Sequence, residues 1–257
     1  MIIAGIDENG RGCIIGPLVI TAYFIDEEKI NELEKIGVKD SKKLSKYKRE
    51  KIFEKLIEIG SYIQEIISAK DLNYLMLKKK MNLNEIELLG ISKLINKSNA
   101  KIYFIDAPFN PKKFKEKLML LLKKDVEIVA DHKMDEKNLV VAAASIIGKV
   151  VRDREIEKIK KEINFDFGSG YVSDEKTRNF LEKVFREKKD YDFIRKAWIT
   201  YEEKSKKKIK KDYRFYMKKI KSLYVFEKNK EKILFIILGI LNSFITFKFY
   251  YFDLIGL

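Results

Sequence analysis

The chain has 257 residues and a mass of 30.3 kDa, enough for one large domain or two small ones. Its hydrophobic fraction of 46% is sufficient for a packed core, which excludes wholesale disorder. A single cysteine excludes a disulfide framework, and a single histidine argues against a multi-histidine zinc site and a Ser-His-Asp triad. Metal chemistry would therefore depend on carboxylates, which favour a hard ion such as magnesium or manganese.

The net charge of +15 is unevenly distributed along the chain. The segment 204–232 contains thirteen Lys or Arg and three acids, a net of +10, so residues 1–203 carry only +5. Because the positive charge is mostly a property of the C-terminal part, nucleic-acid binding by the body has to be inferred from its motifs. No basic leader precedes the opening Met-Ile-Ile-Ala-Gly-Ile, so we expect a cytoplasmic protein.

Strand-like and helix-like stretches alternate along residues 1–203, which predicts an α/β fold with a largely internal sheet. Apolar runs predict strands at 2–6, 14–25, 62–68, 102–105 and 126–130. Helical spacing predicts helices at 41–59, 112–123, 139–163 and 173–188, and two helices within 69–96 that are separated near 81–82. Ser41 or Ser45 is a suitable cap for the first of these helices.

The character of the chain changes after residue 203. A lysine-rich arm, 204–232, is followed by an apolar extension, 233–257, which begins with fifteen uncharged residues. As a helix those fifteen residues would span about 22 Å, less than the hydrocarbon core of about 30 Å. Three interpretations remain open: a tail anchor or interfacial helix in contact with a membrane, an apolar helix packed on the body, and a degenerate extension. The arm suits either a membrane flank or a grip on a nucleic-acid duplex.

Carboxylates follow three of the predicted strands: Asp7 with Glu8, Asp106, and Asp131. In an α/β sheet, functional groups collect at the strand ends near a topological switch point. Acids gathered there repel one another unless cations lie between them. One such acid is more often a turn or cap residue, but three together favour a metal site.

Two further motifs suit phosphate binding. Gly10 and Gly12 allow a close approach of the backbone to a ligand, while the guanidinium of Arg11 between them reaches a phosphate; the alternative is an ordinary hairpin turn. In the second motif, lysines and a hydroxyl precede a predicted helix, where both the lysines and the helix N-terminus favour phosphate, although a solvated cap would look the same. The residues of this second motif are Lys39, Ser41, Lys42 and Lys43.

The stretch 5–17, GIDENGRGCIIGP, resembles the opening signature of ribonuclease HII. That family usually has alanine where Asn9 stands and proline where Cys13 stands. The remaining family motifs follow in the same order and extend the resemblance to about residue 200. They are 37–44 (GVKDSKKL), 105–107 (IDA), 131–135 (DHKMD), 142–153 (AAASIIGKVVRD), 168–174 (GSGYVSD) and 195–198 (RKAW).

The resemblance implies a ribonuclease H-like fold, with a central five-stranded mixed sheet flanked by helices and a helical C-terminal part. It also implies an endonuclease that hydrolyses the RNA strand of RNA–DNA hybrids and incises 5′ of ribonucleotides embedded in duplex DNA, leaving 5′-phosphomonoesters. These duplexes would be its partners, and no obligate protein partner is inferred. The alternatives are another ribonuclease H-like nuclease, of the HIII type or a resolvase, and an inactive hybrid-binding protein in which Asn9 and Cys13 are signs of decay.

The family's functional residues transfer onto matching positions of this chain. Two Mg²⁺ or Mn²⁺ ions would be held by catalytic carboxylates, and substrate would be bound by the two phosphate motifs and by Tyr171, which stacks on the sugar 3′ of the ribonucleotide. The Gly10–Gly12 segment would sense the 2′-hydroxyl, chiefly through backbone groups. Asp131 competes for the fourth metal position, but the spacing from Asp135 to 142–145 matches the archaeal-type form of the family. The implied metal ligands are Asp7, Glu8, Asp106 and Asp135.

Overall fold

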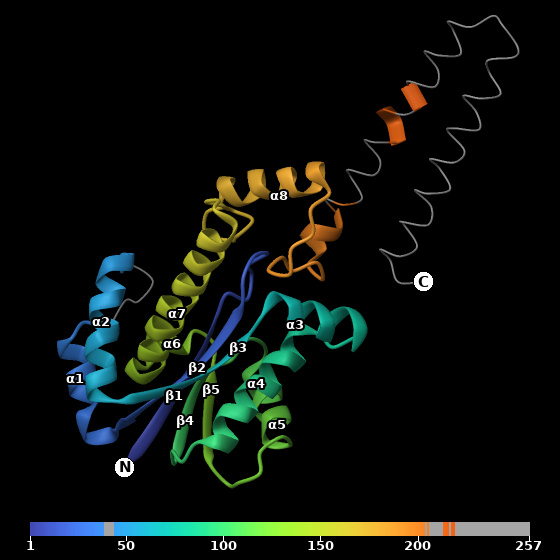
Figure 1. Ribbon diagram of the computed structural model, residues 1–257. Helices are drawn as coiled ribbons and strands as arrows, with labels where there is room; N and C mark the ends of the chain where they lie inside the picture. Colours follow the sequence, from blue (N-terminus) through green and yellow to red (C-terminus); the bar gives the residue numbers. More distant parts are fainter. Residues whose placement is uncertain (39–43, 204, 206–212, 216, 219–257) are drawn as a thin grey trace, which may run out of the picture. The chain divides into compact units, whose positions relative to one another are not determined.

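The computed structural model describes residues 1–38, 44–203, 205, 213–215 and 217–218 (Figure 1). The chain divides into two units, Met1–Glu202 and Glu203–Leu257, and every named strand and helix lies in the first. The prediction of phosphate contacts at residues 39–43 lies outside the described residues, as do nearly all of the predicted arm and apolar extension. In the ranges given above, no helix is long and apolar enough to cross a membrane.

A five-stranded mixed sheet with the order β3-β2-β1-β4-β5 forms the centre of the first unit. β1 pairs antiparallel with β2 and parallel with β4, so the strand direction changes at β1. The outer pairs are antiparallel β2–β3 and parallel β4–β5. This arrangement confirms the fold class expected from the sequence. The strands are β1 (Ile2–Asn9), β2 (Leu18–Asp26), β3 (Ser61–Ile67), β4 (Ile102–Asp106) and β5 (Glu127–Asp131).

Helices cover both faces of the sheet and enclose two separate cores (Figure 1). One core lies between the sheet and α3, α4 and α5, and the other lies between the sheet and α1, α2 and α7. The bounds on the first face are α3 (Ala69–Asn73), α4 (Leu83–Lys97) and α5 (Pro111–Met119). Those on the second are α1 (Ile30–Lys35), α2 (Lys46–Ile59) and α7 (Leu139–Ile163), with the short α6 (Met134–Lys137) just before α7.

The long helix α7 lies very close to the central strand β1. A Cβ atom on Gly5 would be 2.2 Å from the backbone carbon of Val140, so only glycine permits this approach. Small residues continue along the same part of α7, where 142–145 reads Ala-Ala-Ala-Ser and all four side chains are buried. The strand end that carries the acids is therefore covered directly by the first half of α7.

Three predicted elements differ from the structure by four residues or more at a boundary. The strand expected at 14–25 begins only at Leu18, because Gly16 takes a left-handed φ of +89° and Pro17 lacks an N–H for the ladder. The helix expected at 41–59 begins at Lys46, with Ser45 as its cap, and the helix expected at 112–123 ends at Met119.

Two short helices, α1 and α6, were not predicted from the sequence. The break predicted near 81–82 is confirmed, because Asn82 forms a capping box that begins α4.

A third, smaller core joins the end of α7 to α8 (Glu175–Glu187) and to the segment around Ile194. Four aromatic rings from this region, Phe167, Phe180, Tyr191 and Phe193, pack against one another. This third core carries the turn that contains Tyr171.

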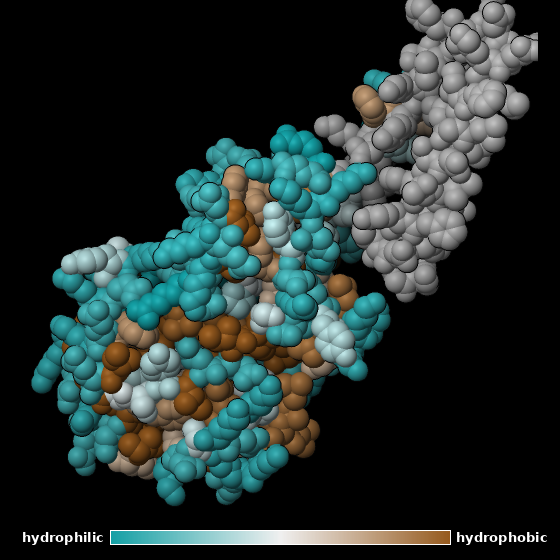
Figure 2. Space-filling view, in the orientation of Figure 1, coloured by the Kyte–Doolittle hydropathy of each residue, from teal (hydrophilic) through white to brown (hydrophobic). Residues whose placement is uncertain are grey.

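Figure 2 shows hydrophilic side chains over most of the visible face and hydrophobic ones gathered near its middle, where the edge strand β3 runs in Figure 1.

Candidate active site

Four carboxylates from three places in the sequence lie near one end of β1. Asp7 and Glu8 lie near the end of β1, and Asp106 is the last residue of the neighbouring parallel strand β4. The backbone N–H of Met134 donates to Asp106 Oδ1 over 3.2 Å, which fixes the start of α6 beside the end of β4. Asp135, the next residue, is consequently close enough to interact electrostatically with Asp7.

The electrostatics of Asp7 and Glu8 reflect this convergence. The pKa of Asp7 is raised to about 7, chiefly by burial and also by the negative charges of Asp106 and Asp135, while a hydrogen bond with Ser145 opposes the shift. The pKa of Glu8 is raised well above its usual value by burial and by the charge of Asp7. A bound cation would stabilise the charged forms of these two acids at neutral pH.

Asp131 and Asp135 are distinguished by their surroundings. Asp131 accepts a 2.5 Å salt bridge from Lys137, and this hydrogen bond lowers its pKa. Its side chain is 49% exposed, whereas Asp135 is only 8% exposed and interacts with Asp7. Asp131 is thus already neutralised at the surface, and this supports the preference for Asp135 as the fourth member of the cluster.

Helix α7 contributes two polar side chains to the same cluster. Lys149 Nζ donates to Ser145 Oγ over 2.9 Å, and Ser145 in turn hydrogen-bonds with Asp7. The positive charge of Lys149 lowers the pKa of Asp7 and partly compensates its burial. Ser145 and Lys149 are one helical turn apart, so both point to the same side of α7.

The carboxylates suit a hard divalent cation in their chemistry, because they offer only oxygen donors and are crowded enough to repel one another. As the side chains stand, however, no three His, Cys, Asp or Glu side chains in the described part of the chain are close enough together to hold one metal ion. A cation would therefore have to draw these acids closer when it binds.

The glycine-rich loop after β1 is joined to the distant Gly168–Tyr171 turn. The N–H groups of Ile14 and Ile15 both donate to the carbonyl of Gly170, over 2.9 and 3.2 Å, and Cys13 forms an antiparallel bridge with Tyr171. Gly170 has a φ of +83°, and a Cβ atom there would be 2.8 Å from the carbonyl oxygen of Ile15. The two segments expected to contact substrate are therefore one continuous surface.

The ring of Tyr171 lies at this junction, and one of its faces packs against Arg152. The guanidinium of Arg152 is centred 4.9 Å from the ring, and Arg152 Nη2 donates to the carbonyl of Ser169 over 3.0 Å. Burial raises the pKa of Tyr171 to about 12, and a hydrogen bond with Cys13 adds to the shift. The cysteine at the position where the family usually has proline thus contacts Tyr171 directly.

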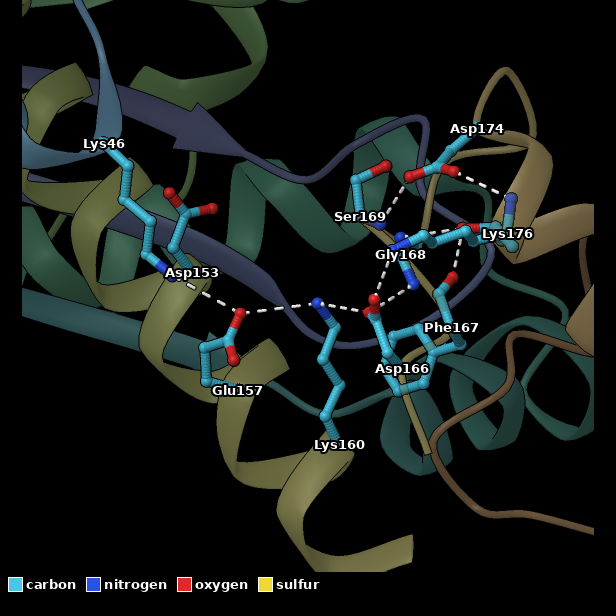
Figure 3. A network of polar contacts seen from close by, with 12 residues as sticks. Lys46, Asp153, Glu157, Lys160, Asp166, Phe167, Gly168, Ser169, Asp174 and Lys176 are labelled. Atoms are coloured by element: carbon cyan, nitrogen blue, oxygen red, sulfur yellow. Dashed lines mark hydrogen bonds and ion pairs between the residues drawn. The ribbon is translucent and has the colours of Figure 1, made fainter. Parts of the chain in front are cut away.

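A network of ion pairs braces the Gly168–Tyr171 turn from the solvent side (Figure 3). Asp166 binds Lys160 over 3.0 Å and Lys176 over 2.6 Å, and it accepts the backbone N–H of Gly168. Asp174, the cap of α8, accepts the N–H of Ser169 over 2.7 Å. Acids of this network fix the backbone of the turn, in contrast with those at the end of β1.

Arg11 does not point its guanidinium outward to a phosphate, as the sequence pattern suggested. Its Nη1 forms an ion pair with Glu87, and its Nη2 donates to Asn84 Oδ1 over 2.6 Å, both on α4. The guanidinium is turned toward α4 because a fully buried carboxylate is available there. Gly12 is exposed, whereas Gly10 is buried, with Arg152 and the carbonyl of Pro17 packed against its Cα.

Several residues with evident roles at the site received none in the sequence analysis: Ser145, Lys149, Arg152, Glu87 and Arg195. The first three lie in the 142–153 motif but were quoted only as part of a pattern. Glu87 had a signal of its own, since it is an acid within the apolar face of α4, flanked by the buried Ile86 and Leu88. Arg195 belongs to the 195–198 motif, and its burial follows only from the tertiary structure.

Comparison with known proteins shows which family this chain is similar to. The family model described as Ribonuclease HII matches residues 4–201. A Pyrococcus abyssi protein named Ribonuclease HII is 41% identical over 205 residues, which are 78% of this chain and 89% of that protein.

Solved structures are similar in fold as well as in sequence. The crystal structure of ribonuclease H2 from Pyrococcus horikoshii OT3 superposes with a TM-score of 0.74 at 39% identity, and the match covers 82% of this chain and all of that one. The structure titled as the PCNA:RNase HII complex from Archaeoglobus fulgidus matches with a TM-score of 0.72 at 38% identity, covering 77% of this chain and 95% of that chain.

Proposed function

Since the chain belongs to the ribonuclease HII family, we propose that it is an endoribonuclease that hydrolyses the RNA strand of RNA–DNA hybrids and cuts 5′ of ribonucleotides embedded in duplex DNA. The cut leaves a 5′-phosphate on the downstream fragment. The observation that carries this proposal is the buried Asp7, whose raised pKa reflects burial next to Asp106 and Asp135. A buried cluster of acids facing a substrate loop is what hydrolysis of a phosphodiester assisted by divalent cations requires.

Four side chains hold the cations in this proposal: Asp7, Glu8, Asp106 and Asp135. Two Mg²⁺ or Mn²⁺ ions bound there would activate the attacking water and neutralise charge on the leaving 3′-oxygen. Asp7 is the central ligand because it interacts with both Asp106 and Asp135. Ser145 orients the Asp7 carboxylate, and Lys149 limits the net negative charge of the cluster before cations bind.

Substrate selection belongs to the surface formed by Gly10–Gly12 and Tyr171. The backbone of the glycine loop reads the 2′-hydroxyl, the one group that distinguishes RNA from DNA locally. Tyr171 stacks on the sugar that follows the ribonucleotide, with Arg152 supporting the other side of its ring. Because the main-chain bonds from Ile14 and Ile15 to Gly170 join the two segments, they act as one reading surface.

The test uses a DNA duplex with one embedded ribonucleotide, the purified protein, and its Asp7→Asn variant. We expect cleavage on the 5′ side of the ribonucleotide by the wild type with Mg²⁺ or Mn²⁺, a 5′-phosphate on the product, and no cleavage in EDTA. The Asp7→Asn variant should bind the duplex and leave it intact. An uncut duplex with both metals present would overturn the proposed activity, and unchanged cleavage by the variant would overturn the role of Asp7.

A further inference from the structure

The guanidinium of Arg11 is held by two residues of α4. Its Nη1 pairs with Glu87 and its Nη2 donates to Asn84 Oδ1 over 2.6 Å. Asn84 and Glu87 are three residues apart and therefore share one face of the helix. Two contacts to a planar guanidinium fix its direction as well as its position, which a single charge pair would not do.

The main chain of Arg11 is held from another direction by Arg195. This fully buried side chain donates from Nη1 to the carbonyl of Arg11 over 3.2 Å and from Nε to the carbonyl of Gly16 over 2.9 Å. Its guanidinium also lies 4.7 Å from the ring of Trp198. The carbonyls of Arg11 and Gly16 are thus fixed to one rigid group, and Glu87 supplies the remaining hold on the side chain.

Glu87 occupies a place where a carboxylate is costly. It is fully buried between Ile86 and Leu88 on α4, and its second oxygen, Oε1, has no hydrogen-bond partner. Burial raises the pKa of Glu87 to about 7, against the opposing charge of Arg11. Replacing both members of such an ion pair with apolar side chains of similar size is often neutral or stabilising, whereas removing one member alone is costly. The fold alone therefore gives no reason for an acid at this position.

We propose that Glu87 is a positioning residue: by anchoring the Arg11 side chain to α4, it holds the Gly10–Gly12 backbone in the conformation that reads the ribonucleotide. The inference rests on the proposed function, because it assigns a role to the loop that selects the substrate. It makes Arg11 an anchor whose guanidinium faces the protein, while the backbone of the loop stays accessible to the substrate at the exposed Gly12. Arg195 holds the main chain of the loop and Glu87 holds the Arg11 side chain, so the loop conformation is fixed from two sides.

The experiment compares Glu87→Met, Arg11→Met and the double variant. Methionine keeps the length of each side chain and removes the ion pair. The matched control is Glu65→Met, which breaks the 2.6 Å ion pair between Glu65 and Lys93 of the same helix α4 without touching Arg11. Two readouts are needed: amide hydrogen exchange of residues 10–15, and the rate of cleavage of a duplex with a single ribonucleotide.

We expect exchange of the loop amides to become about tenfold faster or more in Glu87→Met and Arg11→Met, an effect of about 1.4 kcal/mol or more. Cleavage of the single-ribonucleotide duplex should fall by a similar factor, while the melting temperature of the double variant stays the same or rises. The double variant should resemble either single variant, since both remove one shared interaction. Glu65→Met should behave as the wild type in both readouts.

Unchanged loop exchange in Glu87→Met would overturn the proposal, and so would losses in the double variant that multiply those of the single variants. A melting temperature of the double variant that falls in proportion to the lost cleavage would also overturn it, because the Arg11–Glu87 pair would then serve the fold alone. If the wild type does not cleave the duplex, the proposed function fails, but the exchange data still decide whether Glu87 holds the loop.

Discussion

Acids at the end of β1 and acids around the Gly168–Tyr171 turn have opposite environments. Burial raises the pKa of Asp7, and Ser145 and Lys149 compensate this shift in part. Asp166 is exposed, and hydrogen bonds from Lys176 and Lys160 hold its pKa far below the usual range (Figure 3). A hydrogen bond from the backbone N–H of Ser169 likewise lowers the pKa of Asp174. The charged form of the carboxyl group is therefore stabilised around the turn and destabilised at the end of β1.

The difference teaches how to separate acids that bind a ligand from acids that build a turn. An acid whose charge is matched by lysines and N–H groups of the chain has no need of an external cation. Ionisation of an acid that is buried among other acids destabilises the folded protein, and binding of an external cation can offset that loss. Asp131, paired with Lys137, belongs to the first class although it lies near the second.

The largest effect should come from replacing Asp135, and it should contrast with the replacement of the nearby Asp131. Asp135→Asn should reduce cleavage by about 10²–10³-fold, the scale on which a single electrostatic group contributes to catalysis. Asp131→Asn should retain cleavage within about twofold, since Asp131 is exposed and its charge is matched by Lys137 and screened by solvent. Rates for both variants on the single-ribonucleotide duplex provide the check. If Asp131→Asn lost more activity than Asp135→Asn, the comparison would be misassigned.

The pH dependence of stability should differ between the two regions. In metal-free protein, native Asp7 keeps its proton up to a pH of about 7, whereas unfolded Asp7 loses it near the ordinary value of 3.8. Stability should therefore fall as pH rises through this interval, by on the order of 4 kcal/mol. Asp7→Asn removes this decrease, so in EDTA the variant should be the more stable protein at pH 8.

Urea unfolding of both proteins at pH 4, 6 and 8 measures this effect. Adding Mg²⁺ at pH 8 should stabilise the wild type and leave Asp7→Asn nearly unchanged. Curves for the two metal-free proteins that stay parallel from pH 4 to pH 8 would show that Asp7 carries no burial penalty.

Loss of the Tyr171 ring should affect one substrate more than another. A stacking contact is worth about 1–3 kcal/mol, so Tyr171→Ala should cleave the single-ribonucleotide duplex roughly 5- to 150-fold more slowly. A continuous RNA–DNA hybrid should be affected less, because it offers many alternative registers. Tyr171→Phe keeps the ring over Arg152 and serves as the control. Equal losses on both substrates for Tyr171→Ala would mean that the tyrosine serves only packing.

The smallest effect should come from the exposed network. Asp166→Asn should cost at most about 1 kcal/mol of stability at neutral pH and less at high salt, because its ion pairs are solvent-exposed. The pKa of Asp166 is lowered in the fold, so its contribution is present above pH 4 and is lost as the pH falls. Unfolding at pH 3 and pH 7 measures this, and cleavage should stay within about twofold of wild type. A large loss of cleavage would give this acid a direct role.

The five strands, the longer helices and the set of candidate acids could be predicted from local sequence, whereas the short α1 and α6 could not. Apolar runs predicted all five strands and helical spacing predicted the helix 139–163, because burial leaves a pattern in neighbouring residues. The cap Ser45 was readable for the same reason, since it acts within three residues of itself. The family motifs added the identity of residues that matter, without their contacts.

Only the tertiary structure decided what depends on residues distant in the sequence. The N–H groups of Ile14 and Ile15 pair with Gly170 rather than continuing β2, and no local pattern encodes a contact across more than 150 residues. The guanidinium of Arg11 turns toward Glu87 because α4 brings a buried carboxylate beside it. Asp135 and Asp131 have the same residue type in the same motif, and burial beside Asp7 or pairing with Lys137 separates them. Such differences in solvation arise only when the chain is packed, because burial is a property of the neighbours and not of the residue itself.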